Sequence, residues 1–166
     1  GRLLPDLSAV SVYGRHREPE PGWAWPNDRE PLEFTCNSGV PGPQKVALKI
    51  CVTADIADDR VIQALPEEPV SIWEIRSSRL GASELRNKGD LSRFRELVGK
   101  TFDAIKDQHG MDVELSVFPA APGACAVEFG RTWQHKAHSP FLIYDQIPDQ
   151  GFVVRHEIRA STQAGD

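Results

Sequence analysis

The sequence has few cysteines and no long apolar run, and both absences restrict what the chain can be. Its three cysteines, Cys36, Cys51 and Cys125, are odd in number and share no Cys-x-x-Cys spacing. We expect Cys51 and Cys125, which lie in apolar runs, to be buried thiols of a reducing compartment. No apolar run approaches the ~18 residues of a transmembrane helix. Neither a membrane span nor a signal peptide is therefore expected, and the predicted location is the cytoplasm.

The sequence also lacks a block of basic residues. It has 19 Lys and Arg against 24 Asp and Glu, a formal charge of −5. Direct binding to duplex DNA by this chain is therefore not expected. A ligand that carries phosphate would have to be held by a few local basic groups and by backbone amides. A hydrophobic fraction of 40% in 166 residues is enough for the core of one domain.

The first part of the chain is rich in residues that interrupt helices and strands. Residues 14–45 combine Pro, Gly and charge, which predicts a long loop with one short strand at 32–36. We therefore interpret residues 1–44 as a Pro/Trp-rich N-terminal segment, either a linker or the remnant of a first half. The opening "GRLLPDL", without Met, suggests a domain cut from a longer protein.

From Lys45 onward, apolar strands alternate with helical patterns. "KVALKICVT" is rich in β-branched residues and predicts a strand buried on both faces. A helix at 58–65 follows, with Asp58 as its expected N-cap, and residues 69–75 form the next strand. Apolar residues spaced by three and four predict an amphipathic helix over 90–109 that Gly110 ends.

The remaining elements continue the alternation. We expect a third strand at 112–119, a short helix at 123–133 and a fourth strand at 140–147, with 151–158 as its hairpin partner. Strands and helices in alternation are typical of an α/β fold, a mainly parallel sheet with helices on both faces. Residues 45–160 are thus predicted to be a Rossmann-like domain.

Ligands of open parallel sheets gather at the carboxyl ends of the strands. Three segments leave those ends here: 53–59, 76–81 and 119–124. The last, "PAAPGA", enters a helix whose first amides have no intrahelical partner, which suits a phosphate or a base edge. The alternative is a βα turn that is small for packing, with Pro at its first helical position. Arg76 and Arg79, which flank two serines, either clamp a phosphodiester or lie on a solvated loop.

The four tryptophans differ in context. Trp23 and Trp25 lie among prolines in "PGWAWP" and either stack on bases or pack the loop onto the sheet. We expect Trp73, within a strand, to belong to the core, and Trp133 to be a packing residue.

No spacing predicts a metal site or a nucleophile. His135 and His138 lie on a loop at the opposite edge of the sheet, and no further ligand accompanies them, so no metal is expected. Cys125 follows a helix start, which would favour a thiolate, yet it falls on the expected packed face. No paired carboxylates suggest acid–base hydrolysis.

Some of these motifs resemble a known family. "LSVFPAAPGACAVEFGR", followed by "SPFLIYDQ", is similar to the C-terminal signature of SAVED domains. That signature has a strand ending in Phe-Pro-Ala-x-Pro, a helix with Ala-Val that ends in Gly-Arg, and Pro-x-x-x-Tyr-Asp in the next strand. "LKICVTADI" and "VSIWEIRSSRLG" occupy the places of the family's earlier strands and loops. The resemblance covers residues 45–147.

The resemblance implies both a fold and a function. SAVED domains are related to the CARF Rossmann-like sensors and bind cyclic oligonucleotides in bacterial anti-phage defence, in CBASS and some type III CRISPR systems. They are commonly fused to an effector, such as a nuclease, which ligand-driven oligomerisation activates. The family usually has two Rossmann-like halves, whereas this chain has clearly one.

The predicted function is therefore a non-catalytic sensor of a cyclic di- or trinucleotide that needs no cofactor. Binding is expected to order loops 53–59 and 76–81 and to drive self-association. The expected ligand-binding residues are Thr53, Ala54, Asp55, Ile56, Arg76, Ser77, Ser78, Arg79, Pro119, Ala120, Ala121, Pro122 and Gly123, with Trp23 and Trp25 stacking on bases. Two alternatives remain open: an enzyme that cleaves such a nucleotide on the same scaffold, and a pure protein-interaction domain that docks through its Trp/Pro segment.

Overall fold

A computed structural model describes residues 11–13, 20–65 and 69–159 of the chain. Within these ranges it contains a six-stranded sheet and three helices. The strands are β1 (Phe34–Asn37), β2 (Lys45–Cys51), β3 (Val70–Ser77), β4 (Glu114–Ala120), β5 (Phe141–Ile147) and β6 (Gly151–Ile158), and the helices are α1 (Asp58–Ala64), α2 (Lys88–His109) and α3 (Gly123–Thr132). The opening residues on which the prediction of a cut domain rests lie outside the described ranges.

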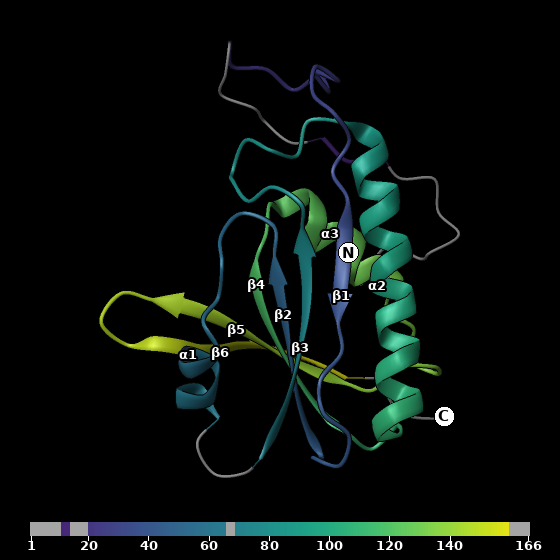
Figure 1. Ribbon diagram of the computed structural model, residues 1–166, viewed down its shortest axis with the longest axis vertical. Coiled ribbons are helices and arrows are strands. Elements are labelled where there is room, and N and C mark those ends of the chain that lie inside the picture. Colours follow the sequence, from purple (N-terminus) through teal and green to yellow (C-terminus); the bar gives the residue numbers. More distant parts are fainter. Residues whose placement is uncertain (1–10, 14–19, 66–68, 160–166) are drawn as a thin grey trace, which may run out of the picture.

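The sheet has the strand order β1-β3-β2-β4-β5-β6. Its four central strands, β3, β2, β4 and β5, are parallel, whereas β1 and β6 pair with their neighbours in antiparallel fashion. The predicted mainly parallel sheet, the short first strand and the hairpin of the last two strands are therefore confirmed. Figure 1 shows this hairpin projecting sideways from the body of the sheet.

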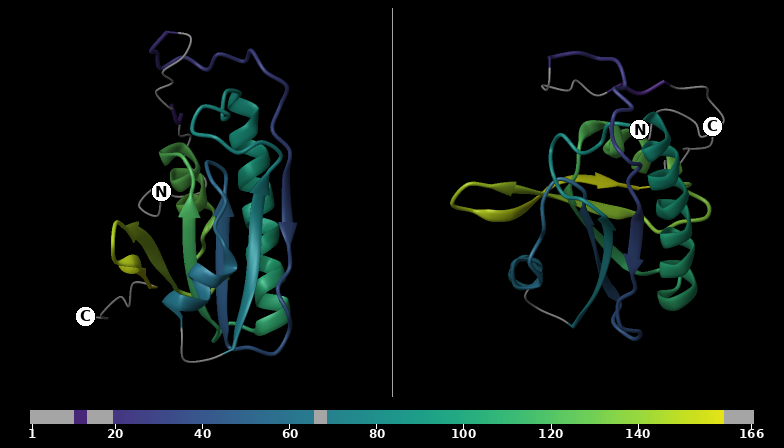
Figure 2. Two further views of the ribbon diagram at one scale, coloured as in Figure 1. Left: turned by 60° about the vertical axis from the view of Figure 1, so that its left-hand side comes forward. Right: turned by 45° about the horizontal axis from the view of Figure 1, so that its top comes forward.

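Helices cover both faces of the sheet, as predicted (Figure 2). One face of β2 packs against α2 and α3 through Val46, Leu48 and Ile50. Its other face, with Ala47 and Cys51, belongs to a second cluster with α1. β2 is thus buried on both faces, which explains its nearly continuous apolar sequence.

Local signals set the ends of the helices. α2 begins with a capping box, in which Asn87 and Asp90 satisfy each other's backbone amides, and it ends at Gly110, whose φ of 84° disfavours other residues. The prediction for α1 was wrong in one detail: Ala57 is the N-cap residue and Asp58 is the first helical residue. The carboxylate of Asp58 binds the Lys49 ammonium group instead of capping the helix.

The tryptophans predicted to be structural are buried. Trp73 is 2% exposed and Trp133 is 8% exposed, and both belong to the larger core cluster. Cys51 and Cys125 are buried thiols, also as expected. Among the described residues, none of the helices combines the length and the apolar character that crossing a membrane requires.

Candidate functional site at the carboxyl edge of the sheet

The carboxyl ends of β2, β3 and β4 meet at one edge of the sheet, at the top of Figure 1. The chain continues from β2 to β3 on one side and later reaches β4 on the other side, so the strand order changes direction between β2 and β4. Such a switch point is where open α/β sheets bind their ligands.

Backbone hydrogen bonds join the three predicted segments at this edge. The amides of Val52 and Thr53 both donate to the carbonyl oxygen of Ala120, at 2.9 and 2.8 Å. The amide of Gly81 donates to the carbonyl oxygen of Val52 at 3.2 Å. The segments 53–59, 76–81 and 119–124 thus lie side by side, as the sequence predicts.

On the face that α1 covers, five ionisable side chains form a charged cluster: Lys49, Asp55, Asp58, Glu74 and Arg76. The Lys49 Nζ atom contacts Asp58 Oδ1 at 2.6 Å, Glu74 Oε2 at 2.8 Å and the Ile56 carbonyl oxygen at 3.1 Å. Its side chain is only 8% exposed. Burial alone would lower the pKa of Lys49, but hydrogen bonds to Asp58 and Glu74 raise it, so the group is charged at neutral pH.

Arg76 lies at the exposed side of the charged cluster. Its Nη1 atom is 2.7 Å from Asp55 Oδ1 and 3.8 Å from Glu74 Oε2. Of the four predicted residues between β2 and α1, Asp55 and Ala54 are exposed, Thr53 is half-buried, and Ile56 is buried in the core. Arg76 and Asp55 are therefore brought together, whereas Ile56 acts as an anchor of the loop.

Two carboxylates of the charged cluster, Asp55 and Glu74, lie with the neighbouring Cys51 thiol in a group of three potential metal ligands whose donor atoms are within 4.8 Å of one another. Burial raises the pKa of the Cys51 thiol, which keeps it protonated. The two carboxylates are in contact with Arg76, and Glu74 also contacts Lys49. These contacts favour a cluster of ion pairs over a metal site.

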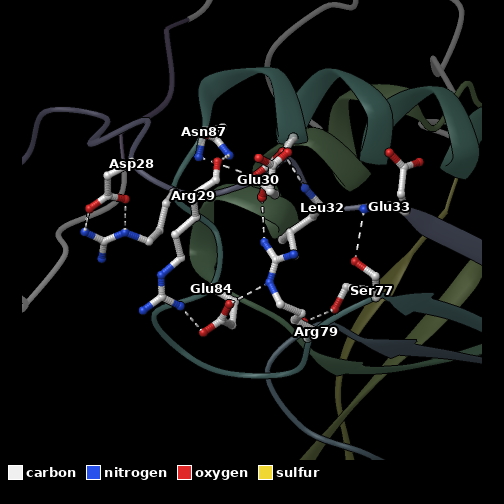
Figure 3. A network of polar contacts seen from close by, with 12 residues as sticks. Asp28, Arg29, Glu30, Leu32, Glu33, Ser77, Arg79, Glu84 and Asn87 are labelled. Atoms are coloured by element: carbon white, nitrogen blue, oxygen red, sulfur yellow. Dashed lines mark hydrogen bonds and ion pairs between the residues drawn. The ribbon is translucent and has the colours of Figure 1, made fainter.

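The other predicted polar residues, at the end of β3 and just after it, contact the 28–33 segment or the loop that follows β3 (Figure 3). Ser77 is buried and its hydroxyl donates to the Arg79 carbonyl oxygen at 2.6 Å. Ser78 Oγ accepts from the Glu33 amide at 3.1 Å. Arg79 binds Glu84 Oε2 through Nε at 3.0 Å and the Glu30 carbonyl oxygen through Nη2 at 2.6 Å. Arg76 and Arg79 thus have separate carboxylate partners.

On the opposite side of this edge, Trp23 and Trp25 line a groove of about 520 Å³ together with the start of α3. We call it the aromatic groove; its walls include Tyr13, Trp23, Trp25, Leu85, Pro122 and Gly123. Trp23 is 63% exposed. Trp25 is half-buried, packs against the core and donates from Nε1 to the Val12 carbonyl oxygen at 3.2 Å. Trp25 thus packs the loop onto the core, as one of the two predictions has it, whereas the exposed Trp23 leaves base stacking as a prediction.

The start of α3 is open toward this groove. The N-cap residue is Pro122, whose ring offers no acceptor to the first amides of the helix. Gly123 is exposed, and a Cβ atom added to it would meet no atom within 4 Å. A flat or anionic group could therefore approach this backbone closely.

The remaining predicted residues lie on the other flank of α3. Pro119 and Ala121 line a small apolar recess of about 250 Å³ between α3 and the sheet, whereas the carbonyl oxygen of half-buried Ala120 accepts from the two amides that follow β2. Cys125 also lines this recess and is fully buried. Burial and the nearby carboxylates raise the pKa of its thiol to about 12. Cys125 is therefore a poor nucleophile at neutral pH.

Sequence reasoning missed Lys49, Tyr13 and Glu84. A lysine inside the apolar run "VALKIC" was a signal for Lys49, because a buried ammonium group requires carboxylate partners. Glu84 lies five residues from Arg79, within reach of a loop contact. Tyr13 had no local signal, since only the fold places it near α3.

Three solved structures of the Acinetobacter baumannii Cap4 SAVED/CARF-domain containing receptor are similar to this fold. The structure with the cyclic trinucleotide 2'3'3'-cAAA has a TM-score of 0.63 at 16% sequence identity, over 80% of this chain and 28% of the receptor chain. The structure with 3'3'3'-cAAA has a TM-score of 0.61 at 14% identity, over 81% and 29%. A third structure of the receptor has a TM-score of 0.55 at 15% identity, over 76% and 26%.

This chain thus spans little more than a quarter of the receptor chains that it resembles. A comparison with curated protein sequences finds no match. The SAVED family, described as the "SMODS-associated and fused to various effectors sensor domain", matches residues 1–157, which include both the Trp/Pro-rich segment and the sheet. With this match over nearly the whole sequence and a fold shared with the Cap4 receptor, the chain belongs to the SAVED sensor-domain family.

Proposed function

We propose that this SAVED domain binds a cyclic di- or trinucleotide at the carboxyl edge of its sheet and acts as a sensor in anti-phage defence. The observation that carries the proposal is the aromatic groove. Exposed Trp23 faces a volume of about 520 Å³ beside the open start of α3. That volume is in the ~300–1,000 Å³ range of small-molecule sites.

The groove and the charged cluster offer different chemistry to such a ligand. An exposed indole stacks on a base, a contact that is typically worth ~1–3 kcal/mol. The first amides of α3, at Gly123 and Ala124, suit a base edge or a phosphate oxygen. Arg76, the more exposed of the two cations in the charged cluster, suits a phosphodiester. The aromatic groove and the charged cluster both lie at the edge of the sheet that loops 53–59 and 119–124 form.

The similarity to Cap4 supports this class of ligand. Two of the similar receptor structures contain a cyclic trinucleotide of adenosine. The proposed ligand carries two or three negative charges, which a domain with a formal charge of −5 can bind through local contacts. We propose no catalytic role, and burial of Cys125 with a pKa of about 12 supports this.

We extend the proposal to signalling. Ligand binding is proposed to order the edge loops, to drive self-association and to activate an effector fused to this domain in a longer chain. We expect the sensor to act in the cytoplasm, because a second messenger is read in the compartment where it is made.

The test is a binding screen of the purified chain against cyclic di-, tri- and tetranucleotides, with the linear form of each as a control. A ligand at one hundred times its Kd stabilises a protein by about 2.7 kcal/mol, which raises the Tm by several degrees. Any hit is then measured by titration calorimetry, and its effect on molar mass by light scattering.

Tighter binding of one cyclic species than of its linear form supports the sensor proposal. Turnover of the bound ligand would favour the nucleotide-cleaving alternative. Binding to no member of the panel would refute the sensor proposal for this chain and favour the protein-interaction alternative.

A further inference from the structure

The charged cluster has an excess of negative charge at the place where a phosphodiester is proposed to bind. Lys49 and Arg76 supply two positive charges, whereas Asp55, Asp58 and Glu74 supply three negative charges. An anion that enters this cluster therefore meets carboxylates as well as cations. The contacts of each charged group show which carboxylate a ligand phosphate can displace.

Lys49 is fully engaged inside the cluster. An ammonium group has three donors, and Nζ has three acceptors within 3.1 Å, from Asp58, Glu74 and Ile56. With a side chain that is only 8% exposed, Lys49 has no surface for a ligand. It holds the start of α1 against the sheet, so Asp58 and Glu74 are structural partners.

Arg76 and Asp55 form the exposed pair of the cluster. Their side chains are 35% and 60% exposed, and the contact joins Nη1 to one carboxylate oxygen at 2.7 Å. A guanidinium group binds carboxylate and phosphate oxygens in the same planar fork geometry. The Asp55 carboxylate therefore lies where a phosphate oxygen would bind to Arg76.

The loop that carries Asp55 is fixed on both sides of it. Val52 and Thr53 are held by the Ala120 carbonyl oxygen, and Ile56 is 3% exposed in the core with its carbonyl oxygen on Lys49. Between these anchors, Ala54 and Asp55 are exposed. A change of the Asp55 side-chain rotamer alone would uncover Arg76, without any movement of the sheet.

We propose that Asp55 is an internal counter-ion of Arg76, which a ligand phosphodiester must displace in order to bind. The inference rests on the proposed function. Simple phosphate anions compete poorly with a carboxylate that is already in place. A cyclic oligonucleotide gains further contacts in the aromatic groove, which offset the cost of displacing Asp55, so that it still binds.

The test compares Asp55→Asn with Asp112→Asn. Both variants remove one negative charge, but exposed Asp112 precedes β4 at the opposite edge of the sheet. Asp55→Asn is expected to bind the cyclic trinucleotide cAAA about two- to fivefold more tightly than the wild type, the range that one exposed ion pair provides. Asp112→Asn is expected to bind like the wild type. Equal affinities of all three proteins would overturn the inference.

A double-mutant cycle tests whether Asp55 acts through Arg76. In an Arg76→Gln background, Asp55→Asn is expected to give no further gain in affinity, because the counter-ion then has no cation to cover. An undiminished gain in that background would mean that Asp55 acts through general repulsion and would overturn the inference. Equal Tm values of the variants would exclude a folding defect as the cause.

A second probe separates this inference from the proposed function. Inorganic pyrophosphate is titrated while the Nε–H resonance of Arg76 is followed by NMR. The resonance is expected to shift at lower pyrophosphate concentration in Asp55→Asn than in the wild type. That result would support the role of Asp55 as counter-ion of Arg76 even if no cyclic nucleotide binds. Identical pyrophosphate titrations of the two proteins would overturn this role even if the wild type binds cAAA.

Discussion

The carboxylate of Asp90 in α2 binds the backbone amide of Leu32, a residue 58 positions earlier in the chain, at 3.0 Å. Both residues are buried, with exposures of 0% and 0%. Asp90 also accepts from the Asn87 amide at 3.3 Å and pairs with Arg93 at 2.5 Å. One side chain thus caps a helix and attaches the N-terminal segment to it.

We predict that Asp90→Ala lowers the free energy of unfolding by about 2–4 kcal/mol. The substitution removes a capping interaction, worth about 1 kcal/mol, and leaves the buried Leu32 amide without its acceptor, which costs about 1–3 kcal/mol. Urea unfolding measures the change. Glu96→Ala, in the same helix but with a 67% exposed side chain, is the control and should change stability by less than about 1 kcal/mol. Equal effects would contradict the role of Asp90.

Trp23 and Trp25 should respond differently to substitution. Trp23→Ala changes a residue that is 63% exposed, so it should leave the Tm nearly unchanged and weaken ligand binding by about fivefold or more, since stacking is worth ~1–3 kcal/mol. Trp25→Ala removes packing against the core and the hydrogen bond to Val12, so it should lower the Tm. Calorimetric titration and thermal unfolding of both variants check this. An unchanged affinity of Trp23→Ala would exclude stacking on this residue.

His138 should make stability fall in mild acid. It is 7% exposed, stacks on Phe102 with ring centroids 4.8 Å apart, and accepts from the Gln134 amide at Nδ1. Burial lowers the pKa of His138 below its ordinary value of 6.5. Between the ordinary and the lowered pKa, the unfolded chain therefore binds a proton at His138 that the folded chain does not. The free energy of unfolding falls as the pH decreases through this interval.

The measurement is urea unfolding at about pH 7.5 and about pH 5.5. His138→Asn, whose side-chain oxygen can replace Nδ1 as the acceptor, should lose less stability across this interval than the wild type. His135→Asn, which changes an exposed histidine in the same loop, should behave like the wild type. If the three proteins lose the same stability, His138 is not the group responsible.

Cys125 should be unreactive in the folded protein. With a pKa of about 12, only about one thiol in ten thousand is a thiolate at pH 8, and the side chain is fully buried. Brief treatment with iodoacetamide, followed by peptide mass spectrometry, should leave Cys125 unmodified in buffer and modify it in urea. Rapid labelling in buffer would contradict the buried, protonated thiol and would revive the enzyme alternative.

Local sequence patterns were sufficient to predict most of the fold. The apolar run of β2 and the spacing of Leu91, Phe94, Val98 and Phe102 in α2 reflect burial directly, because the period of burial is the period of the element. The Pro-Gly junction at 122–123 marked the start of α3 correctly. The error at Asp58 arose because its carboxylate has a stronger partner, the buried ammonium group of Lys49, than the helix amides.

The contacts of the candidate site were less predictable than its location. The edge where segments 53–59, 76–81 and 119–124 meet follows from the parallel topology. The partners of Arg76 and Arg79 do not, because Asp55 and Glu30 lie 21 and 49 residues away and no local pattern links them. The position of Trp23 beside α3 likewise depends on contacts between segments that are distant in the sequence, such as that of Arg86 with Asp28 at 2.5 Å.

The shared acceptor at Ala120 has a kinetic consequence. Two successive amides, of Val52 and Thr53, depend on one carbonyl oxygen on the neighbouring strand end. Any separation of β2 from β4 at this edge frees both hydrogens in the same event. Where every opening leads to exchange, the two amides take up deuterium together, and the rate reports how often the edge opens, without a ligand.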